Sequence, residues 1–340
     1  MRANFKDVYA AAGVDIDAAN EIKRNIAQQV ASTLHPAVLN FGSFGSMFQF
    51  QGYDEPVLVS SVDGVGTKLK IASLLNKHDT VGMDIVNHCV NDIVCCGAKP
   101  LFFLDYIAME KVVPEQIEAI VAGMVKACKE VGCSLIGGET AEMPGIYCRG
   151  NYDLAGFIVG VVEKKEIIDG SRIVAGDTVL GLPSSGLHTN GYSLVRHIFR
   201  VEEDPTCLYR FYPELGEPLA EELLQPHRCY YGELKMVLPL VKGLAHITGG
   251  GFIGNIPRIL PKGFAAHLRK DSWDTLPIFK LIQEKGNIDE EEMYRVFNMG
   301  IGMTIVCSPQ EVNRLVAILP EAKTIGKIIR AQGEERIILN

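Results

Sequence analysis

The sequence predicts a two-domain protein of mixed α/β and α+β architecture. It contains 340 residues, and single domains commonly contain about 100–200. In both halves, short runs rich in Val, Ile and Phe alternate with stretches of helical periodicity. From Lys164 to Asp177 the chain becomes rich in charged residues and glycine. We therefore expect a boundary near Asp169, dividing the chain into residues 1–168 and 169–340.

The first half contains four predicted strands, at 56–62, 101–109, 134–136 and 154–162, bounded mainly by Gly, Asp and Pro. A helix is predicted over 114–131. Pro114 suits a first turn, the apolar residues from Ile117 to Val131 recur at helical spacing, and Gly132 supplies a stop. A second helix is predicted over 84–94.

The second half repeats this alternation. Strands are predicted at 178–183 and 303–307, with a final strand at 323–329, and helices at 192–199 and 309–319. Such mixed patterning indicates layers of sheet and helix in both halves.

Composition narrows the class of protein. The chain is 47% hydrophobic and 22% charged, as expected for a folded protein with a core. Its net charge of −8 argues against a nucleic-acid partner, which would require a basic surface. No apolar run approaches the roughly 20 residues that span a bilayer, and no secretory signal is evident. We therefore expect a cytoplasmic protein without a membrane partner.

The first segment whose residues could bind a ligand or catalyse a reaction follows the strand at 56–62. It presents Asp63, then Gly64, Gly66 and Thr67, then Lys68. A carboxylate beside open backbone N–H groups and an ammonium suits a magnesium-bound polyphosphate. The alternative is an Asp-Gly turn with a solvated lysine.

A second candidate is Asp92, which is flanked by apolar residues in the helix at 84–94. A carboxylate in such surroundings is costly unless it is paired, capped or bound to metal. Asn87, His88, Asn91 and Asp92 share one helical face, so the alternative is the polar stripe of an amphipathic helix.

Three further segments combine glycines with polar side chains. After the strand at 134–136, Gly137 and Gly138 precede Glu139 and Thr140, which could bring an acid to a cation or form only a surface loop. The segment 184–191 places hydroxyls and an imidazole at a helix start, where Thr189 or Asn190 could also serve as the N-cap. In 246–254, a glycine turn follows His246. It matches Gly-x-Gly-x-x-Gly, but Pro257 and Pro261 interrupt the helix that a dinucleotide fold requires, so we favour a turn that presents amides to phosphate.

Taken together and in order, these segments resemble the phosphoribosylformylglycinamidine cyclo-ligases, also called aminoimidazole ribonucleotide synthetases. The superfamily includes formylglycinamidine synthetase, selenophosphate synthetase and thiamine phosphate kinase. The resemblance spans nearly the whole chain, through AGVDID (12–17), VDGVGTK (62–68), GGETAEMPG (137–145), SSGLHTNGYSLVR (184–196), HITGGGFIGNIPR (246–258) and MYRVFNMGIGM (293–303). One departure is the segment 40–46, where the family has a denser glycine loop.

The resemblance implies an aminoimidazole ribonucleotide synthetase-like fold. In that fold, two subunits would pair through their N-terminal sheets to form a homodimer, and the C-terminal domain of each would be an α+β sandwich. It also implies ATP-dependent ring closure of the small-molecule substrate formylglycinamidine ribonucleotide. A non-catalytic ATP-binding or maturation scaffold of the same superfamily is the alternative.

The resemblance also implies roles for individual residues. The magnesium ligands would be Asp63, Asp92 and Glu139. ATP would contact Asp63, Gly64, Gly66, Thr67, Lys68, Asn91, Asp92, Gly137, Gly138, Glu139 and Thr140. The substrate would contact Ser184, Ser185, Gly186, His188, Asn190, Thr248, Gly249, Gly250 and Gly251. The catalytic groups would be His188, His246, Lys68 and Asp92, and either histidine could carry protons because imidazole titrates near neutral pH.

Overall fold

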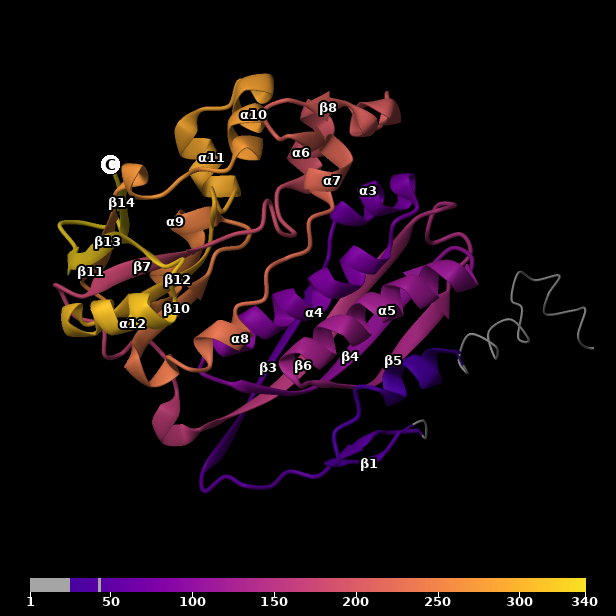
Figure 1. The fold of residues 1–340 in the computed structure, drawn as a ribbon, viewed down its shortest axis with the longest axis horizontal. Coiled ribbons are helices and arrows are strands. Elements are labelled where there is room, and N and C mark those ends of the chain that lie inside the picture. Colours follow the sequence, from indigo (N-terminus) through magenta and orange to yellow (C-terminus); the bar gives the residue numbers. More distant parts are fainter. Residues whose placement is uncertain (1–24, 42–43) are drawn as a thin grey trace, which may run out of the picture.

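The computed structural model describes residues 25–41 and 44–340 and contains two layered units, each built around its own sheet (Figure 1). The motif at 12–17 and residues 42 and 43 of the atypical glycine segment lie outside the described residues. None of the described helices has both the length and the apolar composition needed to cross a membrane.

The N-terminal sheet has four strands in the order β3-β6-β4-β5. They are β3 (Pro56–Gly64), β4 (Lys99–Met109), β5 (Ser134–Glu142) and β6 (Tyr152–Glu163). Only β4 and β5 run parallel, joined by a helical crossover. The helices of this unit are α3 (Lys68–Leu75), α4 (Asp79–Val94) and α5 (Pro114–Val131), and a short ribbon pairs β1 (Val38–Asn40) with β2 (Met47–Phe48).

Helix α4 is the central element of the molecule. It packs on β3, β4 and β6 on one side and on α5 on another, and it also contacts α8 and β10 of the C-terminal unit. Most of its residues are consequently buried, including polar ones such as Asp84, Asn87 and Asn91. In Figure 1 the segment that leads into α8 runs alongside α4.

The C-terminal sheet has six strands in the order β10-β12-β7-β13-β11-β14, antiparallel except for β11 with β14. They are β7 (Thr178–Pro183), β10 (Val241–His246), β11 (Phe264–Leu268), β12 (Ile301–Cys307), β13 (Lys323–Arg330) and β14 (Ile337–Leu339). A two-residue ribbon pairs β8 (Phe211–Tyr212) with β9 (Glu217–Pro218).

Short helices surround this sheet. The α-helices are α6 (Tyr192–Ile198), α7 (Leu219–Leu223), α8 (Tyr231–Leu234), α9 (Gly251–Asn255), α10 (Pro277–Gly286), α11 (Glu290–Val296) and α12 (Val312–Ile318). The 3₁₀ turns are η1 (Lys164–Glu166), η2 (Pro205–Tyr209), η3 (Leu238–Leu240), η4 (Ile256–Ile259), η5 (Lys270–Ser272) and η6 (Pro309–Glu311).

The mixed sheet-and-helix architecture and most predicted elements are confirmed, with α5 and β7 at the predicted bounds. The strand at 323–329 is not the last one, because β14 follows and pairs with β11. The helix predicted over 309–319 begins as the turn η6, with Pro309 in its first turn. The predicted boundary near Asp169 falls in the connection between β6 and β7.

The close packing of α4 on α5 depends on two glycines. A Cβ at Gly82 would lie 2.0 Å from the Ile120 carbonyl oxygen, and one at Gly123 would lie 1.9 Å from that of Asp79. Because both obstacles are backbone atoms, neither helix can accept a methyl group without moving apart.

We expect Gly123→Ala to lower the free energy of unfolding by about 2 kcal/mol or more, because overpacking outweighs the gain in helix propensity. Thermal and urea unfolding would measure the loss. Gly232→Ala is the matched control, since Gly232 is exposed in α8 with open space at the Cβ position. Equal stability of Gly123→Ala and wild type would contradict this account of the packing.

Candidate active site

The polar face of α4 attaches the C-terminal unit to the N-terminal one. Asp84 Oδ1 accepts from the His227 backbone N–H at 2.7 Å, and Asn87 donates to the His227 carbonyl at 2.7 Å. Asn91 donates to the Arg228 carbonyl at 2.8 Å and accepts from the Tyr230 N–H at 2.9 Å. These side chains, spaced three and four residues apart on one face, hold the backbone of 227–230 in place.

A fully buried ion pair strengthens this attachment. Lys68 Nζ lies 2.7 Å from Asp84 Oδ2, and both side chains are 0% exposed. The ammonium also donates to the carbonyls of Gln225 at 2.7 Å and His188 at 3.3 Å. Burial lowers the pKa of Lys68 and raises that of Asp84, and the attraction between the two opposes both shifts. Lys68 therefore ties two loops of the C-terminal unit to α4, and its ammonium is committed to these contacts.

One turn further along α4, two carboxylate–histidine pairs lie between the units. His88 Nε2 is 2.9 Å from Asp63 Oδ2, at the end of β3. His246 Nδ1, at the end of β10, is 2.9 Å from Asp92 Oδ1, whose Oδ2 accepts from the Ser61 hydroxyl at 3.0 Å. The histidine side chains are buried, whereas the Asp63 and Asp92 side chains are 41% and 32% exposed. The carboxylates thus face outward and the imidazoles inward.

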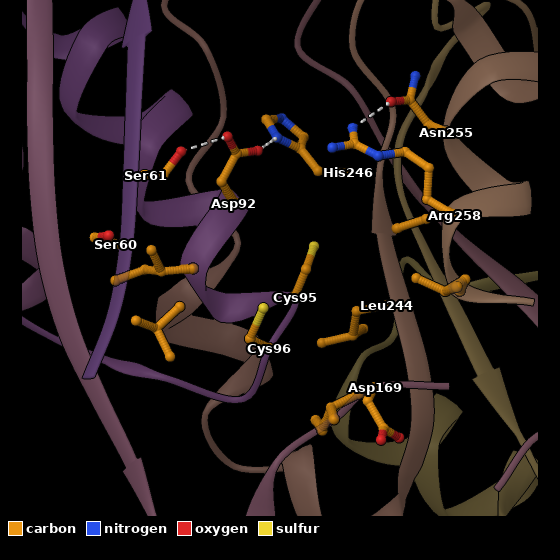
Figure 2. A pocket seen from close by; sticks show the side chains of 15 residues that line it. Ser60, Ser61, Asp92, Cys95, Cys96, Asp169, Leu244, His246, Asn255 and Arg258 are labelled. Carbon is orange, nitrogen blue, oxygen red and sulfur yellow. Dashed lines mark hydrogen bonds and ion pairs between the residues drawn. The ribbon is translucent and has the colours of Figure 1, made fainter. Parts of the chain in front are cut away.

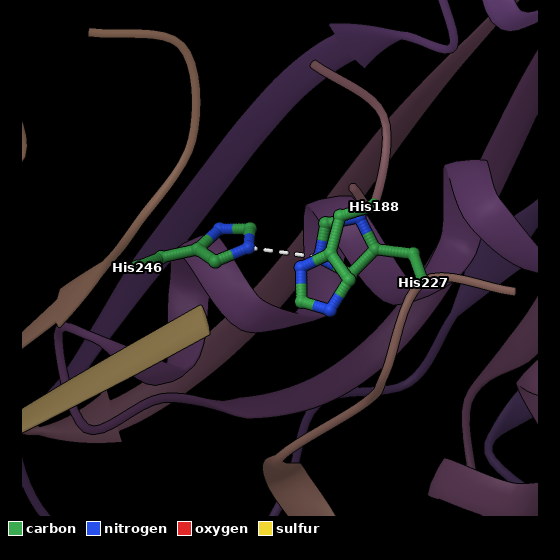
Figure 3. A group of neighbouring side chains, drawn as sticks. All are labelled: His188, His227 and His246. Atoms are coloured by element: carbon green, nitrogen blue, oxygen red, sulfur yellow. Dashed lines mark hydrogen bonds between the residues drawn. The ribbon is translucent and has the colours of Figure 1, made fainter. Parts of the chain in front are cut away.

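His188 and His227 complete a group of four histidines. The His188 and His227 rings stack with centroids 4.0 Å apart, and His227 Nε2 lies 2.9 Å from His246 Nε2 (Figure 3). The Ser185 backbone N–H donates to His188 Nε2 at 3.2 Å. His188 also has a positive φ of 63°, a conformation that non-glycine residues adopt mainly where the surroundings enforce it.

The pKa directions divide the four histidines. Burial lowers the pKa of His88, but the hydrogen bond to Asp63 and its charge outweigh burial, and the net pKa is raised. Burial also lowers the pKa of His246, and the Asp92 contact does not compensate. Burial and neighbouring imidazoles hold the pKa values of His188 and His227 well below the usual value. Of the four, His88 is therefore the imidazole that protonates most readily.

The same contacts keep both carboxylates ionised. Burial raises the pKa of each, but for Asp63 the hydrogen bond and charge of His88 prevail, and for Asp92 those of His246 prevail. The net pKa is lowered in both cases.

A cavity of about 330 Å³ opens beside Asp92 and His246. Figure 2 shows side chains from both units around it: Ser60, Ser61, Asp92, Cys95 and Cys96 from one, and Leu244, His246, Asn255 and Arg258 from the other. The Arg258 guanidinium donates to Asn255 Oδ1 at 3.4 Å. Asn255 Nδ2 in turn donates to the carbonyls of Thr248, Gly249 and Gly251, so it fixes the glycine turn at the cavity's edge.

The structure brings many of the predicted residues to this region. Ser184 and Gly186 are bound to Asn298, and Ser185 donates to the Pro226 carbonyl. Asn190 lies against Gly249, and its Nδ2 is buried with no hydrogen-bond partner among the described residues. Gly64 is the last residue of β3, and Gly66 and Thr67 follow it; the Thr67 hydroxyl lies 3.0 Å from that of Ser193.

One predicted group lies elsewhere within the chain. Gly137, Gly138, Glu139 and Thr140 are on β5, at the opposite edge of the N-terminal sheet from β3. Glu139 and Gly64 occupy one row across that sheet, three strand spacings or roughly 14 Å apart. The structure therefore does not bring Glu139 together with Asp63 in a single chain.

Sequence reasoning missed several residues of the site. His88 belongs to the polar face noted on the helix, and its spacing of four from Asp92 was the available signal. Thr189 was considered only as an N-cap. His227, Asn255 and Arg258 carried no recognisable pattern, because their roles depend on contacts between distant segments.

Comparison with known proteins assigns the class. Residues 47–162 match the N-terminal domain of the AIR synthase related proteins, and residues 174–338 match the C-terminal domain of the same class. Among solved structures, thiamine-monophosphate kinase from Stenotrophomonas maltophilia aligns with a TM-score of 0.66 at 16% identity, covering 93% of this chain and 96% of that one. The hydrogenase maturation protein HypE in complex with ATP aligns with a TM-score of 0.67 at 14% identity, covering 93% and 90%. These two show a shared fold.

Curated relatives define the family more narrowly. The phosphoribosylformylglycinamidine cyclo-ligase of Geobacillus thermodenitrificans is 53% identical over 334 residues, covering 96% of each chain. That of Acetivibrio thermocellus is 54% identical over 331 residues, covering 94% and 95%. The chain belongs to the phosphoribosylformylglycinamidine cyclo-ligase family.

We expect Lys68→Met to lower the free energy of unfolding by about 3–5 kcal/mol, because it leaves Asp84 charged and buried without a partner. Denaturant unfolding would measure it. Adding Asp84→Asn should recover part of the loss, since the amide can still accept from the His227 N–H. Lys70→Met on the same helix is the control, because Lys70 is only half-buried and bonds one side chain, Asn151. A Lys68→Met protein as stable as Lys70→Met would contradict the structural role of the pair.

Proposed function

We propose that this protein closes the imidazole ring of formylglycinamidine ribonucleotide, using ATP and releasing aminoimidazole ribonucleotide, ADP and phosphate. The observation that carries the proposal is the pair of carboxylate–histidine contacts, Asp63–His88 and Asp92–His246, beside a cavity lined by both units. Identity above 50% to cyclo-ligases over nearly the full chain supports the substrate and the reaction.

The reaction requires activation and positioning. A formamide carbon is a poor electrophile, and its oxygen is a poor leaving group. Transfer of the γ-phosphoryl group of ATP to that oxygen turns it into a good leaving group. The substrate's own amidine nitrogen then attacks the formamide carbon, and phosphate leaves with the oxygen. Because nucleophile and electrophile belong to one molecule, an enzyme that holds them together removes much of the entropic barrier. The protein must also neutralise phosphoryl charge and accept the proton lost by the amidine.

Asp92 and His246 are the best-placed catalytic groups, because both line the cavity. Between the two predicted proton carriers we favour His246 over His188, because His246 lines the cavity and bonds Asp92, whereas His188 is not among the lining residues. We propose that Lys68 acts by positioning the loops at 188 and 225, since its ammonium is fully buried among their carbonyls.

Substrate contacts follow from the remaining polar groups of the cavity region. Asn190 offers an unmatched buried amide beside the turn formed by Thr248, Gly249, Gly250 and Gly251. Arg258 adds a guanidinium at the same side of the cavity. These donors suit the phosphate or amide groups of the substrate. Ser184, Ser185 and Gly186 shape the adjoining loop.

Magnesium is the cation that ATP chemistry requires, and the residues present fit it in part. Asp63 and Asp92 offer partly exposed carboxylates, and Ser61, which bonds Asp92, lies two residues before Asp63 on the same strand face. We propose these two as ligands, directly or through water. Bound magnesium would neutralise phosphate charge. Glu139 of the same chain is too distant to share that ion. If Gly137, Gly138, Glu139 and Thr140 contact ATP, they do so at a part of the site separate from Asp63 and Asp92. Asn91 would act indirectly, by holding the backbone of residues 228–230 in place through its side-chain hydrogen bonds.

We also propose a homodimer that pairs the N-terminal sheets. The outer face of this sheet carries exposed apolar side chains, among them Leu58 at 64%, Val62 at 66% and Phe157 at 39% exposure. Such a patch on a sheet face is typical of an interface. A cytoplasmic location is supported by the phosphorylated substrate and by the nine cysteines, all of which are free thiols.

The first test follows aminoimidazole ribonucleotide and ADP together, with formylglycinamidine ribonucleotide and Mg-ATP. We expect equal amounts of both products from wild type. Asp92→Asn should be slower by about a hundredfold or more, because a neutral amide binds the cation weakly and no longer supports His246 by a charged contact. Asp274→Asn, at a remote exposed ion pair, is the control. ADP without aminoimidazole would contradict the cyclo-ligase, and neither product would favour a binding role.

The dimer has its own test. Val62→Arg should yield a monomer in analytical ultracentrifugation, because a charge cannot be buried in an apolar sheet interface without a partner. Met236→Arg is the matched control, since Met236 is 68% exposed in the other unit. A wild-type monomer, or a Val62→Arg dimer, would overturn the proposed interface.

A further inference from the structure

A group of sulfur atoms lies at the wall of the cavity, where the two units meet. Cys95 directly follows α4, and Met303 is a fully buried residue of β12. The Cys95 thiol donates to Met303 Sδ, and the two sulfurs are 3.9 Å apart. Cys96, the next residue, also lines the cavity, and Figure 2 shows both thiols at its wall. Sulfur atoms from two distant parts of the chain therefore gather in one place.

Backbone contacts hold these sulfur atoms in position. Cys95 caps the last turn of α4, and the Cys96 carbonyl accepts from the Ile168 N–H at 3.1 Å. Met303 lies opposite His246 in the ladder between β10 and β12. The His246 N–H donates to Cys95 Sγ. Because the sulfurs are already placed, a ligand that binds them does not have to order a flexible loop first.

The spacing of the Cys95 and Met303 sulfurs suits a metal ion bound to both. A metal–thiolate bond is about 2.3 Å long. Two bonds of that length to sulfurs 3.9 Å apart enclose an angle of about 116°, which is close to the angle of a trigonal site. A trigonal site needs a third ligand, and Cys96 supplies a thiol at the adjoining position of the same wall.

The kind of ligand selects the kind of ion. Thiolate and thioether sulfur select soft ions such as Cu(I), whereas magnesium and calcium bind oxygen. Zinc binds thiolate, imidazole and carboxylate in tetrahedral sites, so a thioether in a trigonal group does not suit it. We propose that Cys95, Cys96 and Met303 form a binding site for Cu(I), with two thiolates and one thioether as ligands. This inference uses no part of the proposed reaction.

Binding exchanges protons for the ion. The S–H bonds of Cys95 and Cys96 break, three Cu–S bonds form, two protons leave to solvent, and no electron is transferred. Burial raises the pKa of both thiols, so they stay protonated until the metal displaces the protons. The complex carries one negative charge. The Arg258 guanidinium on the other side of the cavity and the His246 N–H stabilise that charge.

Titration of the full chain with the bicinchoninate complex of Cu(I), under nitrogen, tests the site. We expect the wild type to withdraw one tightly bound Cu(I) per chain. Affinity should fall about tenfold or more in Met303→Leu, which keeps the apolar volume without the sulfur, and in Cys95→Ser. Met293→Leu is the matched control, since Met293 is also a fully buried methionine. Equal affinity of Met303→Leu and Met293→Leu would overturn the site.

Other thiols of the chain provide further controls. Cys128 bonds Cys133 within the core, and Cys148 is exposed. Cys133→Ser and Cys148→Ser should each retain the tightly bound Cu(I). Loss of that ion in either variant, with retention in Cys95→Ser, would place the copper elsewhere and overturn the proposal.

X-ray absorption at the copper edge identifies the ligands directly. In protein prepared with selenium in place of methionine sulfur, copper should show a selenium neighbour together with sulfur neighbours. The selenium neighbour should be lost in Met303→Leu and kept in Met293→Leu. A copper shell without selenium would contradict coordination by Met303.

Activity provides a further readout, because Cys95 and Cys96 line the same cavity as Asp92 and His246. One equivalent of Cu(I) should abolish most ring closure by the wild type and leave Met303→Leu at its own metal-free rate. Equal inhibition of both proteins would overturn the link between this site and the cavity. Binding is measured without turnover, so a wild type that makes no aminoimidazole would refute the proposed function and leave the copper site to be decided by titration and absorption.

Discussion

The structure depends on the backbone groups that pair with buried polar side chains of α4. Asp84, Asn87 and Asn91 lie inside the molecule, where an unpaired amide or carboxylate would cost several kcal/mol. Their partners are backbone groups of residues 227–230, which belong to the other unit. The N-terminal helix therefore determines the path of a C-terminal segment, and Lys68 adds the neighbouring loops at 188 and 225 to the same attachment.

This attachment explains why the site can be precise although its residues come from distant parts of the chain. The backbone contacts at 227 place the His227 ring between Thr189 and His246, and the His188 ring stacks on it. Asp92, one turn beyond His88 on α4, then faces the end of β10. The residues of α4 that bind the C-terminal unit thus lie directly beside His88 and Asp92, the residues of α4 that belong to the site. A disturbance at Asp84 or Lys68 should reach the site through the loops that they hold.

Much of the fold follows from local sequence patterns. The helix over 114–131 was predictable because Pro114, a regular apolar stripe and Gly132 mark its beginning, its buried face and its end. The strand at 337–339 was not, because three residues of edge strand carry almost no periodic signal and depend on pairing with β11. Of the short helices between β7 and β12, α6 was predicted at 192–199, whereas α7 to α11 are set by packing.

The site was predictable only where chemistry is concentrated in short motifs. Asp63, Asp92, His188 and His246 stood out because acids and imidazoles adjoined glycine turns or apolar runs. The alternative for this face of α4, the polar stripe of an amphipathic helix, accounts for only some of its residues. Asn87 and Asn91 bind backbone groups of residues 227–230, whereas His88 and Asp92 face the site. His227 could not be found from sequence, because nothing beside it along the chain indicates that it lies between Thr189 and His246.

The central claim is that the reacting groups lie between the two units, on the surfaces that α4 brings together. Hydrogen–deuterium exchange with mass spectrometry tests it most directly, comparing free protein with protein saturated with formylglycinamidine ribonucleotide and a magnesium complex of a non-hydrolysable ATP analogue. The account predicts slower exchange in both units, at the end of β3 around 59–66 and at 244–251. Protection confined to one unit, or located away from the cavity beside Asp92 and His246, would contradict it.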